Sequence, residues 1–514
     1  MRSMPPGERS VVARSRQPLD PWVYACALLA FGLLMAVSAT GYHRDELYFL
    51  EASHHMAWGF VDQPPLSVAI VWVSRELFGT SLVGLRLFPA LADAAIVVLT
   101  GLLARELGGS RFAQVLSALA VAVSPFLVAG HLAGPTIYDL LSWPVVCLLV
   151  LRILHGADRR LWLAVGVAVG VALLDKETIL VLIGGLVLGF LLTKRWDVFR
   201  TPWFWAGGAI ALAFWSPVLV WEAQHSWPTI EMSRSLQQEH SGLGFVPSFV
   251  LFQLLLPGWW MTPVWIAGLV SLWRDPTLRP FAIAYVAAFV FLLLLIPDRP
   301  YYVAGLYPLL LAAGAIVAEE VIAGMRRFLR RGVPRHRLVW GSGSRAIGFV
   351  LAMGLVFLPL ALPVLPASAL ATVPLQNVNY NLAEVVGWPE FVRTIAAIVH
   401  SLPDSEQRTV VLFMGNYGEA GAIDRFGPAL GLPQASSGHN NYWWWGPPRQ
   451  TGGVTVAVGF DRGYLSRLFA HVTQAATIHN GLGVENDEQG SAVWICSGRR
   501  ASWSALWPHR RHYG

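Results

Sequence analysis

Carboxylates are the residues whose position in this sequence most clearly indicates chemistry. Asp45 and Glu46 directly follow one apolar segment, and Asp139 stands at the start of another. A carboxylate held near an apolar boundary can serve as a general base, so we treat Asp45, Glu46 and Asp139 as candidate catalytic residues. Successive side chains on a helix point about 100° apart, and we therefore expect different roles for Asp45 and Glu46. The alternative for all three is the capping of a helix start.

Two cations occupy similar places beside other apolar segments. Lys176 lies between two of these segments, and Arg299 lies between two more. Charged groups are costly in lipid, so they usually face a cavity and mark function. Either side chain could pair with a phosphate group at the depth of the lipid headgroups. The alternative is a side chain that simply extends to the membrane surface.

A metal ion is the third kind of chemistry that the sequence allows. Asp62 and His240 are candidate ligands for a divalent metal ion, although a single histidine in a loop is more often polar surface. We assign no other cofactor. The cysteines, Cys26, Cys147 and Cys496, have no Cys-x-x-Cys spacing. Neither a disulfide framework nor a cysteine metal site is therefore expected.

The composition indicates that membrane spans position these residues. Of the 514 residues, 55% are hydrophobic and 13% are charged, whereas soluble domains have about 25% charged residues. The apolar runs lie between residues 22 and 366, and the basic segment 1–21 lacks the features of a removed signal peptide. Most arginines stand between apolar runs, so the net charge of +6 indicates membrane lipids as partners and not nucleic acid.

We predict a mostly α-helical, polytopic membrane protein with about eleven transmembrane helices. A helical span requires about 20 mostly apolar residues. The fifth and sixth expected spans are short, and merging them would reverse the orientation of everything downstream. The expected spans are 22–40, 82–104, 112–130, 137–154, 161–174, 177–193, 203–221, 248–272, 280–297, 302–323 and 346–366.

The distribution of basic residues predicts the orientation. With the N-terminus in the cytoplasm and eleven spans, the inner segments contain 21 Lys and Arg residues and the outer ones contain six, as the positive-inside rule requires. This predicts a multi-pass cell-membrane protein whose candidate site residues all lie on the outer side. The first outer loop, about residues 41–81, contains an amphipathic stretch that predicts juxtamembrane helices.

The last quarter of the chain predicts a small extracytoplasmic α/β domain at residues 367–500. Strand patterns occur at 409–414, 454–460 and 492–496, with a helical pattern at 389–401. The aromatic run 442–445 is expected to pack this domain onto the membrane face, and sugar binding is the alternative. The predicted organisation is a cytoplasmic tail at 1–21, a membrane domain at 22–366, the α/β domain at 367–500, and a frayed tail at 501–514.

Several short segments together resemble a known family. The first outer loop opens with Asp45-Glu46-Leu47-Tyr48 and closes on Asp62-Gln63-Pro64-Pro65-Leu66, and Asp298-Arg299-Pro300-Tyr301-Tyr302 precedes Leu306-Tyr307-Pro308. This pattern resembles the GT-C membrane glycosyltransferases over about residues 20–325. Within them it looks like the family 39 type, which is dolichyl-phosphate-mannose–protein mannosyltransferase-like and includes bacterial aminoarabinose transferases that modify lipid A.

The resemblance implies an activity and a set of partners. It implies transfer of a hexosyl or pentosyl group from a polyprenyl-phosphate sugar to a protein, lipid or glycan acceptor on the outer face, with inversion at the anomeric carbon. Asp45 looks like the base in the first outer loop, and Glu46 and Asp139 look like further active-site acids. The residues that look like partners of the donor phosphate are Lys176, Arg299, Tyr301 and Tyr302.

The sequence also departs from the family pattern at specific positions. Relatives often have Glu-Lys before the two prolines, whereas this chain has Asp62-Gln63, so one cation is missing there. Asp62 and His240 match positions at which relatives place a metal site. Arg299 stands where Lys is common, and an arginine still binds phosphate.

Two other classes of function remain as alternatives. A transporter or flippase of lipid-linked envelope precursors predicts paired repeats and broken helices with charges near the midplane of the membrane. We find no internal repeat, and the charges lie at the ends of the spans. The third class is a non-enzymatic envelope assembly protein whose outer domain is the working part.

Overall fold

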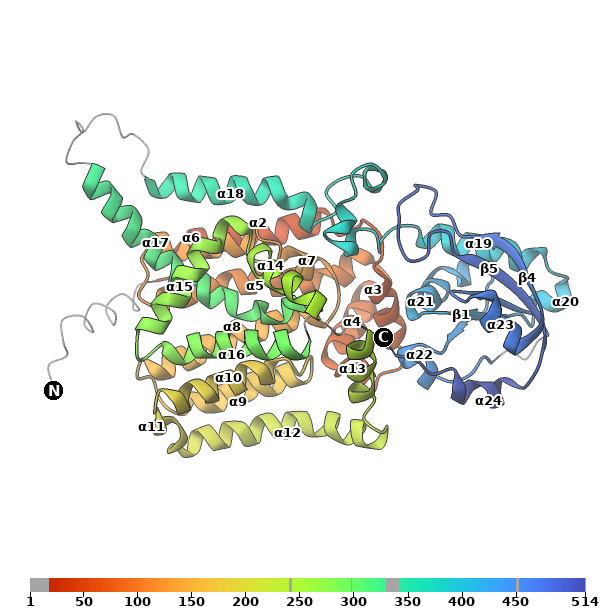
Figure 1. Cartoon of the computed structure of the whole chain (residues 1–514), viewed down its shortest axis with the longest axis horizontal. Helices are drawn as coiled ribbons and strands as arrows, with labels where there is room; N and C mark the ends of the chain where they lie inside the picture. The colour runs from red at the N-terminus through yellow and green to blue at the C-terminus, as the bar shows by residue number, and fades with distance from the viewer. Residues whose placement is uncertain (1–17, 240–242, 297, 330–341, 450–452, 514) are drawn as a thin grey trace.

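The chain forms a long bundle of helices with a sheet-containing domain at one end, as the computed structural model shows (Figure 1). The structure describes residues 18–239, 243–296, 298–329, 342–449 and 453–513. Three helices outside the bundle lie between it and the sheet domain: α3 (Arg44–Ala52), α4 (Leu66–Phe78) and α13 (Pro228–Glu239). We call this end of the bundle the loop end.

The bundle consists of apolar helices whose starts follow local sequence signals. Pro21 and Pro135 stand in the first turns of α2 and α8, where the missing N–H costs nothing. The bundle helices are α2 (Pro21–Ala36), α5 (Leu82–Glu106), α6 (Arg111–Ala122), α7 (Leu127–His131), α8 (Pro135–Leu154), α9 (Leu161–Leu173), α10 (Ile179–Leu192), α11 (Trp196–Phe199), α12 (Pro202–Gln224), α14 (Val246–Leu255), α15 (Thr262–Arg274), α16 (Arg279–Leu295), α17 (Tyr307–Leu329) and α18 (Ser342–Ala361).

Each expected span coincides with an apolar helix or a pair of helices. Within the part of the chain that the structure describes, five helices are long and apolar enough to cross a membrane, and the pair α14 and α15 makes a sixth if it is one broken span. The five remaining expected spans coincide with shorter apolar helices of 10–17 residues. The apolar helices are therefore where the sequence predicts them, and the count of eleven spans stays a prediction.

The expected span at 248–272 is formed by two helices and not by one continuous helix. The chain bends by 78° between α14 and the segment from Trp259 to Arg274, which begins with a short 3-10 helix, η2 (Trp259–Met261). Pro257 and Gly258 occupy the break. Proline cannot continue the helical hydrogen bonds, and Gly258 has a φ of 84°, which glycine adopts without strain.

Glycines allow some helices of the bundle to approach closely. A Cβ atom at Gly268 of α15 would collide with the carbonyl of Leu310 on α17, and one at Gly314 of α17 would collide with the carbonyl of Val264. Small residues at such contacts let helix backbones pack directly on each other, which is typical of membrane helices. A larger side chain at either position would force the two helices apart.

The C-terminal domain contains a five-stranded sheet with strand order β2-β1-β3-β5-β4. Strands β1, β2 and β3 are parallel, and β5 runs antiparallel to β3 and β4. The predicted strands correspond to β1, β3 and β5, whereas β2 and β4 were not predicted. The strands are β1 (Val411–Met414), β2 (Ala435–Ser437), β3 (Thr455–Val458), β4 (Phe469–Thr477) and β5 (Ala492–Arg499).

Helices cover the sheet, and the 3-10 turns η5, η6 and η7 lie in the connection from α18 to the sheet domain (Figure 1). The helices are α19 (Trp388–Ser401), α20 (Asp404–Gln407), α21 (Tyr417–Phe426), α22 (Asn440–Trp444), α23 (Arg462–Leu468) and α24 (Trp503–Leu506). The 3-10 turns are η1 (Leu243–Phe245), η3 (Pro300–Leu306), η5 (Ala367–Ala371), η6 (Leu375–Asn377), η7 (Tyr380–Leu382), η8 (Pro428–Leu430) and η9 (Trp507–His509).

Residues 501–513 are not a frayed tail, so that prediction was wrong. Trp503 and Trp507 are buried in a core that includes β1 and β3. The Arg511 guanidinium pairs with Glu231 of α13 at 3.0 Å, and the Ser235 hydroxyl donates to the Tyr513 carbonyl at 3.0 Å. Buried tryptophans and these bonds hold the segment against the loop end.

Candidate functional site

Lys176 lies in the turn between α9 and α10. Its ammonium group is 4.4 Å from the centroid of the Tyr302 ring and 5.6 Å from that of Tyr301. The backbone N–H of Leu66, at the start of α4, donates to the carbonyl of Leu174 at 2.7 Å. This bond ties the Lys176 turn to the first loop. A cation that faces two aromatic rings is held in place without being neutralised.

Tyr301 and Tyr302 belong to η3, which a buried glutamine fixes. The amide of Gln253, on α14, donates to the carbonyl of Pro300 at 2.9 Å. The Tyr307 hydroxyl donates to the Gln253 side-chain oxygen at 2.8 Å. The bend after α14 therefore places Gln253 where it can hold the start of η3, and with it the two tyrosines that face Lys176.

Asp139 lies near the start of α8 and is buried. The indole N–H of Trp143 donates to its Oδ1 at 3.0 Å. Lys176 is within electrostatic range of Asp139 and also of Asp175. A side chain at Gly305 of η3 would collide with the Trp143 ring, so α8 and η3 are in direct contact. The structure thus brings Asp139, Lys176 and η3 together.

Arg299 stands directly before η3 and has a carboxylate beside it. Its Nε lies 3.2 Å from Asp298 Oδ2. Tyr380, an exposed residue of η7, interacts electrostatically with Arg299, with Tyr301 and with Asp45. Tyr380 is therefore near both groups of predicted site residues, the cations and the first loop.

Asp45 lies in the first turn of α3 with 45% of its side chain exposed. The hydroxyl of Tyr417, the first residue of α21, donates to its Oδ1 at 2.8 Å. On the other side, Asp45 Oδ2 is 3.8 Å from His43 Nδ1. Asp45 is thus a partly open carboxylate at the boundary between the first loop and the C-terminal domain.

Glu46 is fully buried and bound on both oxygens. Arg86 donates to Oε1 from Nε at 2.8 Å and to Oε2 from a terminal nitrogen at 2.6 Å. The backbone N–H groups of His43 and Ala133 also donate to it, at 2.9 and 3.0 Å. With four bonds, Glu46 has little capacity left for proton transfer, so the geometry does not support a catalytic role. It instead caps α3 and joins three segments of the loop end.

Asp62 is the candidate metal ligand that the structure describes. The Tyr48 hydroxyl donates to its Oδ1 at 2.9 Å. Burial raises the pKa of Asp62 to about 7, and the bond from Tyr48 acts in the opposite direction. His240 lies outside the described residues. Among the residues that the structure describes, no three His, Cys, Asp or Glu side chains gather in a metal-binding arrangement, and the metal site stays a prediction.

Three residues of this region were missed by the sequence analysis: Arg86, Tyr380 and Tyr417. Arg86 is a buried cation within an apolar segment, and that signal could have identified it. Tyr417 follows a predicted strand, but its partner Asp45 is 372 positions away. No local pattern predicts such a contact.

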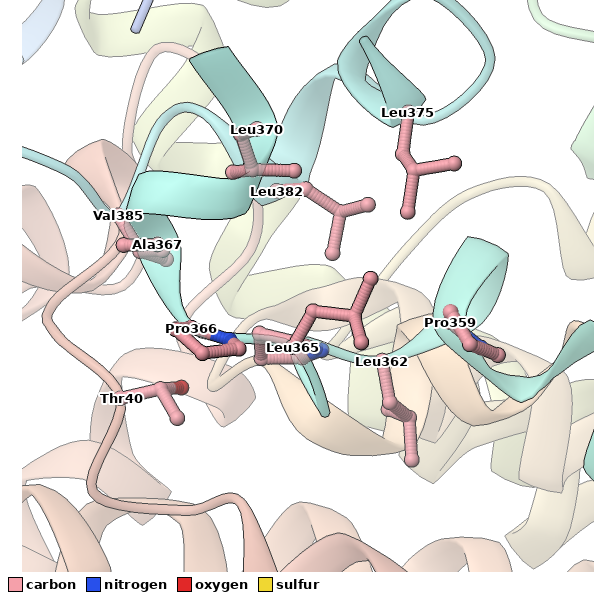
Figure 2. A pocket seen from close by; sticks show the side chains of 11 residues that line it. Thr40, Pro359, Leu362, Leu365, Pro366, Ala367, Leu370, Leu375, Leu382 and Val385 are labelled. Atoms are coloured by element: carbon pink, nitrogen blue, oxygen red, sulfur yellow. The ribbon is translucent and has the colours of Figure 1, made fainter. Parts of the chain in front are cut away.

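An apolar cavity of about 220 Å³ lies beside this region (Figure 2). It is formed by the end of α18, the turns η5 to η7 and the first loop. Leu382 and Val385, which follow Tyr380 in the chain, are in its wall together with Thr40. None of the predicted site residues lines this cavity. The residues that line it are Thr40, Pro359, Leu362, Pro363, Leu365, Pro366, Ala367, Leu370, Leu375, Leu382 and Val385.

Comparisons with known proteins agree with the resemblance inferred from the sequence. Residues 62–221 match the family model described as dolichyl-phosphate-mannose-protein mannosyltransferase. The fold is similar to that of ArnT from Cupriavidus metallidurans bound to undecaprenyl phosphate, with a TM-score of 0.58 and 17% identity over 92% of this chain and 98% of that one. The apo structure of that ArnT gives 0.57 and 17% over 92% and 97%. No curated protein matches the sequence. The resemblance to GT-C membrane glycosyltransferases is therefore confirmed.

Proposed function

We propose that this chain, which resembles the GT-C membrane glycosyltransferases in sequence and fold, transfers a sugar from a polyprenyl-phosphate carrier to an acceptor. The observation that supports this most directly is the set of cations and tyrosines at the loop end. Lys176 faces Tyr301 and Tyr302, and Arg299 adjoins them. Cations and hydroxyl donors fixed at one place are what a phosphate leaving group requires.

The proposed donor is a polyprenyl-phosphate sugar whose phosphate lies between Lys176 and Arg299. Both cations stand at the ends of apolar helices, where the headgroup of a lipid meets the spans. ArnT from Cupriavidus metallidurans, whose fold is similar, was crystallised with undecaprenyl phosphate. We extend that ligand class to this chain, with the sugar as a hexose or a pentose.

The proposed base is Asp45. Its carboxylate removes the proton from an acceptor hydroxyl or amine, and the acceptor atom forms a bond to the anomeric carbon of the sugar. The bond between that carbon and the phosphate oxygen breaks, and the carrier leaves as polyprenyl phosphate with its negative charge stabilised by Lys176 and Arg299. A single displacement of this kind inverts the anomeric configuration. Asp139, within electrostatic range of Lys176, would orient that cation.

We also propose the membrane orientation that the basic residues predict, with the N-terminus in the cytoplasm and the C-terminal domain outside. The loop end would then face the outside, and an acceptor could be a protein, a lipid or a glycan of the envelope. Fusion of a periplasmic reporter enzyme to the C-terminus tests this. Reporter activity is expected, and its absence together with fluorescence of a cytoplasmic reporter at the same site would reverse the orientation.

The transport alternative gains one observation from the structure. A membrane segment broken by 78°, between α14 and α15, is a feature that transporters often have. In this chain, however, Gln253 lies just before the break and donates to the Pro300 carbonyl of η3. The bend therefore contributes to the proposed phosphate site. A flippase would move a labelled lipid-linked precursor across a vesicle membrane without forming a glycosylated product.

The experiment uses the full chain reconstituted in lipid nanodiscs. Undecaprenyl-phosphate hexoses and pentoses, radiolabelled in the sugar, are offered with envelope lipids, peptides and glycans as acceptors. Wild type is expected to transfer one class of sugar, Asp45→Asn to lose transfer, and Glu51→Gln, a carboxylate change on the same helix, to retain it. Absence of transfer by wild type from every donor, or unchanged transfer by Asp45→Asn, would contradict the proposal.

A further inference from the structure

The C-terminal domain and the first loop share one hydrophobic core. Leu47 and Tyr48 of α3 are buried in the same cluster as Ile423 of α21 and Tyr442 of α22. A side chain at Gly421 would collide with the Leu47 backbone. The contact between α3 and α21 is therefore close and apolar, and the domain is not a loosely attached appendage.

Polar bonds fix the direction in which α21 meets α3. Arg44 pairs with Asp487 at 2.6 Å and with Glu384 at 3.4 Å. The backbone N–H of Val61, in the first loop, donates to the Asn441 side chain at 2.7 Å. These bonds involve both the start of α3 and the loop that follows it, so they attach the domain to the first loop at two separate points.

Tyr417 is the residue that this arrangement brings to Asp45. Its ring lies 4.8 Å from the Tyr48 ring, and the Arg44 guanidinium lies 5.2 Å from its centroid. Its hydroxyl donates to Asp45 Oδ1 at 2.8 Å. Burial, and then the nearby Asp45 charge, raises the pKa of Tyr417 well above its ordinary value. The hydroxyl therefore stays protonated and remains a donor at neutral pH.

His43 does not replace Tyr417 as a donor. Its Nδ1 accepts the backbone N–H of Asp45 at 3.2 Å, so this nitrogen has no proton to give to the carboxylate. Burial lowers the pKa of His43, which keeps the ring neutral. Tyr417 thus fixes one oxygen of Asp45, while the carboxylate as a whole is 45% exposed.

We propose that Tyr417 is a positioning residue, by which the C-terminal domain orients the catalytic carboxylate of Asp45 toward the acceptor. This rests on the proposed function, because it assumes that Asp45 is the base. The hydroxyl binds Oδ1 and leaves Oδ2 to receive the acceptor proton. The domain therefore completes the active site, because the Asp45 carboxylate is correctly oriented only when the domain is folded.

The test compares two tyrosines in the full chain, in nanodiscs, with the labelled undecaprenyl-phosphate sugar that wild type uses. Tyr417→Phe removes the hydroxyl but retains the ring contacts with Tyr48 and Arg44. Tyr442→Phe is the matched control, because its hydroxyl donates to another carboxylate of the domain, Asp424, at 2.8 Å. Thermal unfolding of both variants shows that each is folded.

Tyr417→Phe is expected to lower kcat about 10- to 100-fold, as loss of a hydrogen bond to a charged group does. The KM for the donor should be unchanged, since the phosphate site is intact. Tyr442→Phe should retain the wild-type kcat. In single-turnover reactions of Asp45→Asn, adding Tyr417→Phe should change the residual rate by less than about twofold, because Tyr417 acts through Asp45.

Each outcome separates this proposal from the proposed function. If wild type transfers sugar and Asp45→Asn does not, but Tyr417→Phe behaves like Tyr442→Phe, the positioning role alone is wrong. The positioning role is also wrong if Tyr417→Phe lowers the transfer rate of Asp45→Asn by the same factor as that of wild type. The Tyr417 hydroxyl would then act independently of the Asp45 carboxylate. If wild type transfers no sugar, the proposed function fails and the positioning role fails with it.

Discussion

The candidate site has two halves that depend on different parts of the chain. The cationic half consists of Lys176, Arg299, Tyr301 and Tyr302. It is held by the ends of bundle helices and by Gln253 within the bundle. Asp45, the acidic half, is on a loop helix and is bound by Tyr417 of the C-terminal domain. If the proposed function is correct, donor binding depends on the membrane domain, whereas activation of the acceptor depends on both domains.

Asp45→Asn should produce the largest effect in the acidic half. Loss of a general base lowers kcat by about 10²- to 10⁴-fold, while binding of undecaprenyl phosphate to the cationic half should be unchanged. Transfer kinetics together with a lipid-binding assay by native mass spectrometry measure both quantities. An equal loss of turnover and lipid binding would mean that the two halves are not separate.

Glu46→Ala should affect stability and not the chemistry. Removing one member of a buried ion pair leaves Arg86 uncompensated and costs about 3–5 kcal/mol of unfolding free energy. The expected result is a lower unfolding midpoint in denaturant, with kcat per folded molecule reduced far less than in Asp45→Asn. A stable Glu46→Ala protein with no activity would instead restore the catalytic role predicted from the sequence.

Lys176→Gln should affect the cationic half. Removal of a group that stabilises the leaving phosphate lowers kcat by about 10²- to 10³-fold and should weaken binding of undecaprenyl phosphate. The chain offers a matched control, because Lys194 is its other lysine and lies after α10, at the opposite end of that helix from Lys176. Lys194→Gln should resemble wild type in both assays, and equal losses in the two variants would remove Lys176 from the site.

The C-terminal domain should contribute to the pH dependence of stability through Glu419. Burial raises the pKa of Glu419 from 4.5 to about 7, so the folded state binds this proton more tightly than the unfolded chain. Its contribution to stability is present below about pH 4.5 and is lost as the pH rises through about 7, with a slope of at most about 1.4 kcal/mol per pH unit. Thermal unfolding between pH 5 and 8 should show a flatter dependence for Glu419→Gln, and an unchanged slope would argue against this assignment.

Apolar segments and charges at their ends were predictable, because both depend on local composition. The helices at the expected spans follow from them, whereas the grouping of Lys176, Asp139 and Tyr302 in one site was implied by the family resemblance. Pro257 and Gly258 are a signal for a helix break, but the long apolar run around them predicted one span. Different roles for Asp45 and Glu46 were predicted, but not which carboxylate is buried and which is open. That depends on Arg86 and Tyr417, which are distant in the chain.

The separation between Asp45 and Tyr417 also has a consequence during synthesis. The two residues are 372 positions apart, and a ribosome adds about 5–20 residues per second, so roughly 20–70 s pass between them. Through that interval the bundle helices enter the membrane while the carboxylate has no hydroxyl to orient it. With the proposed role of Tyr417, a nascent chain can bind donor lipid early, and transfer reaches its full rate only after the last domain has folded onto the first loop.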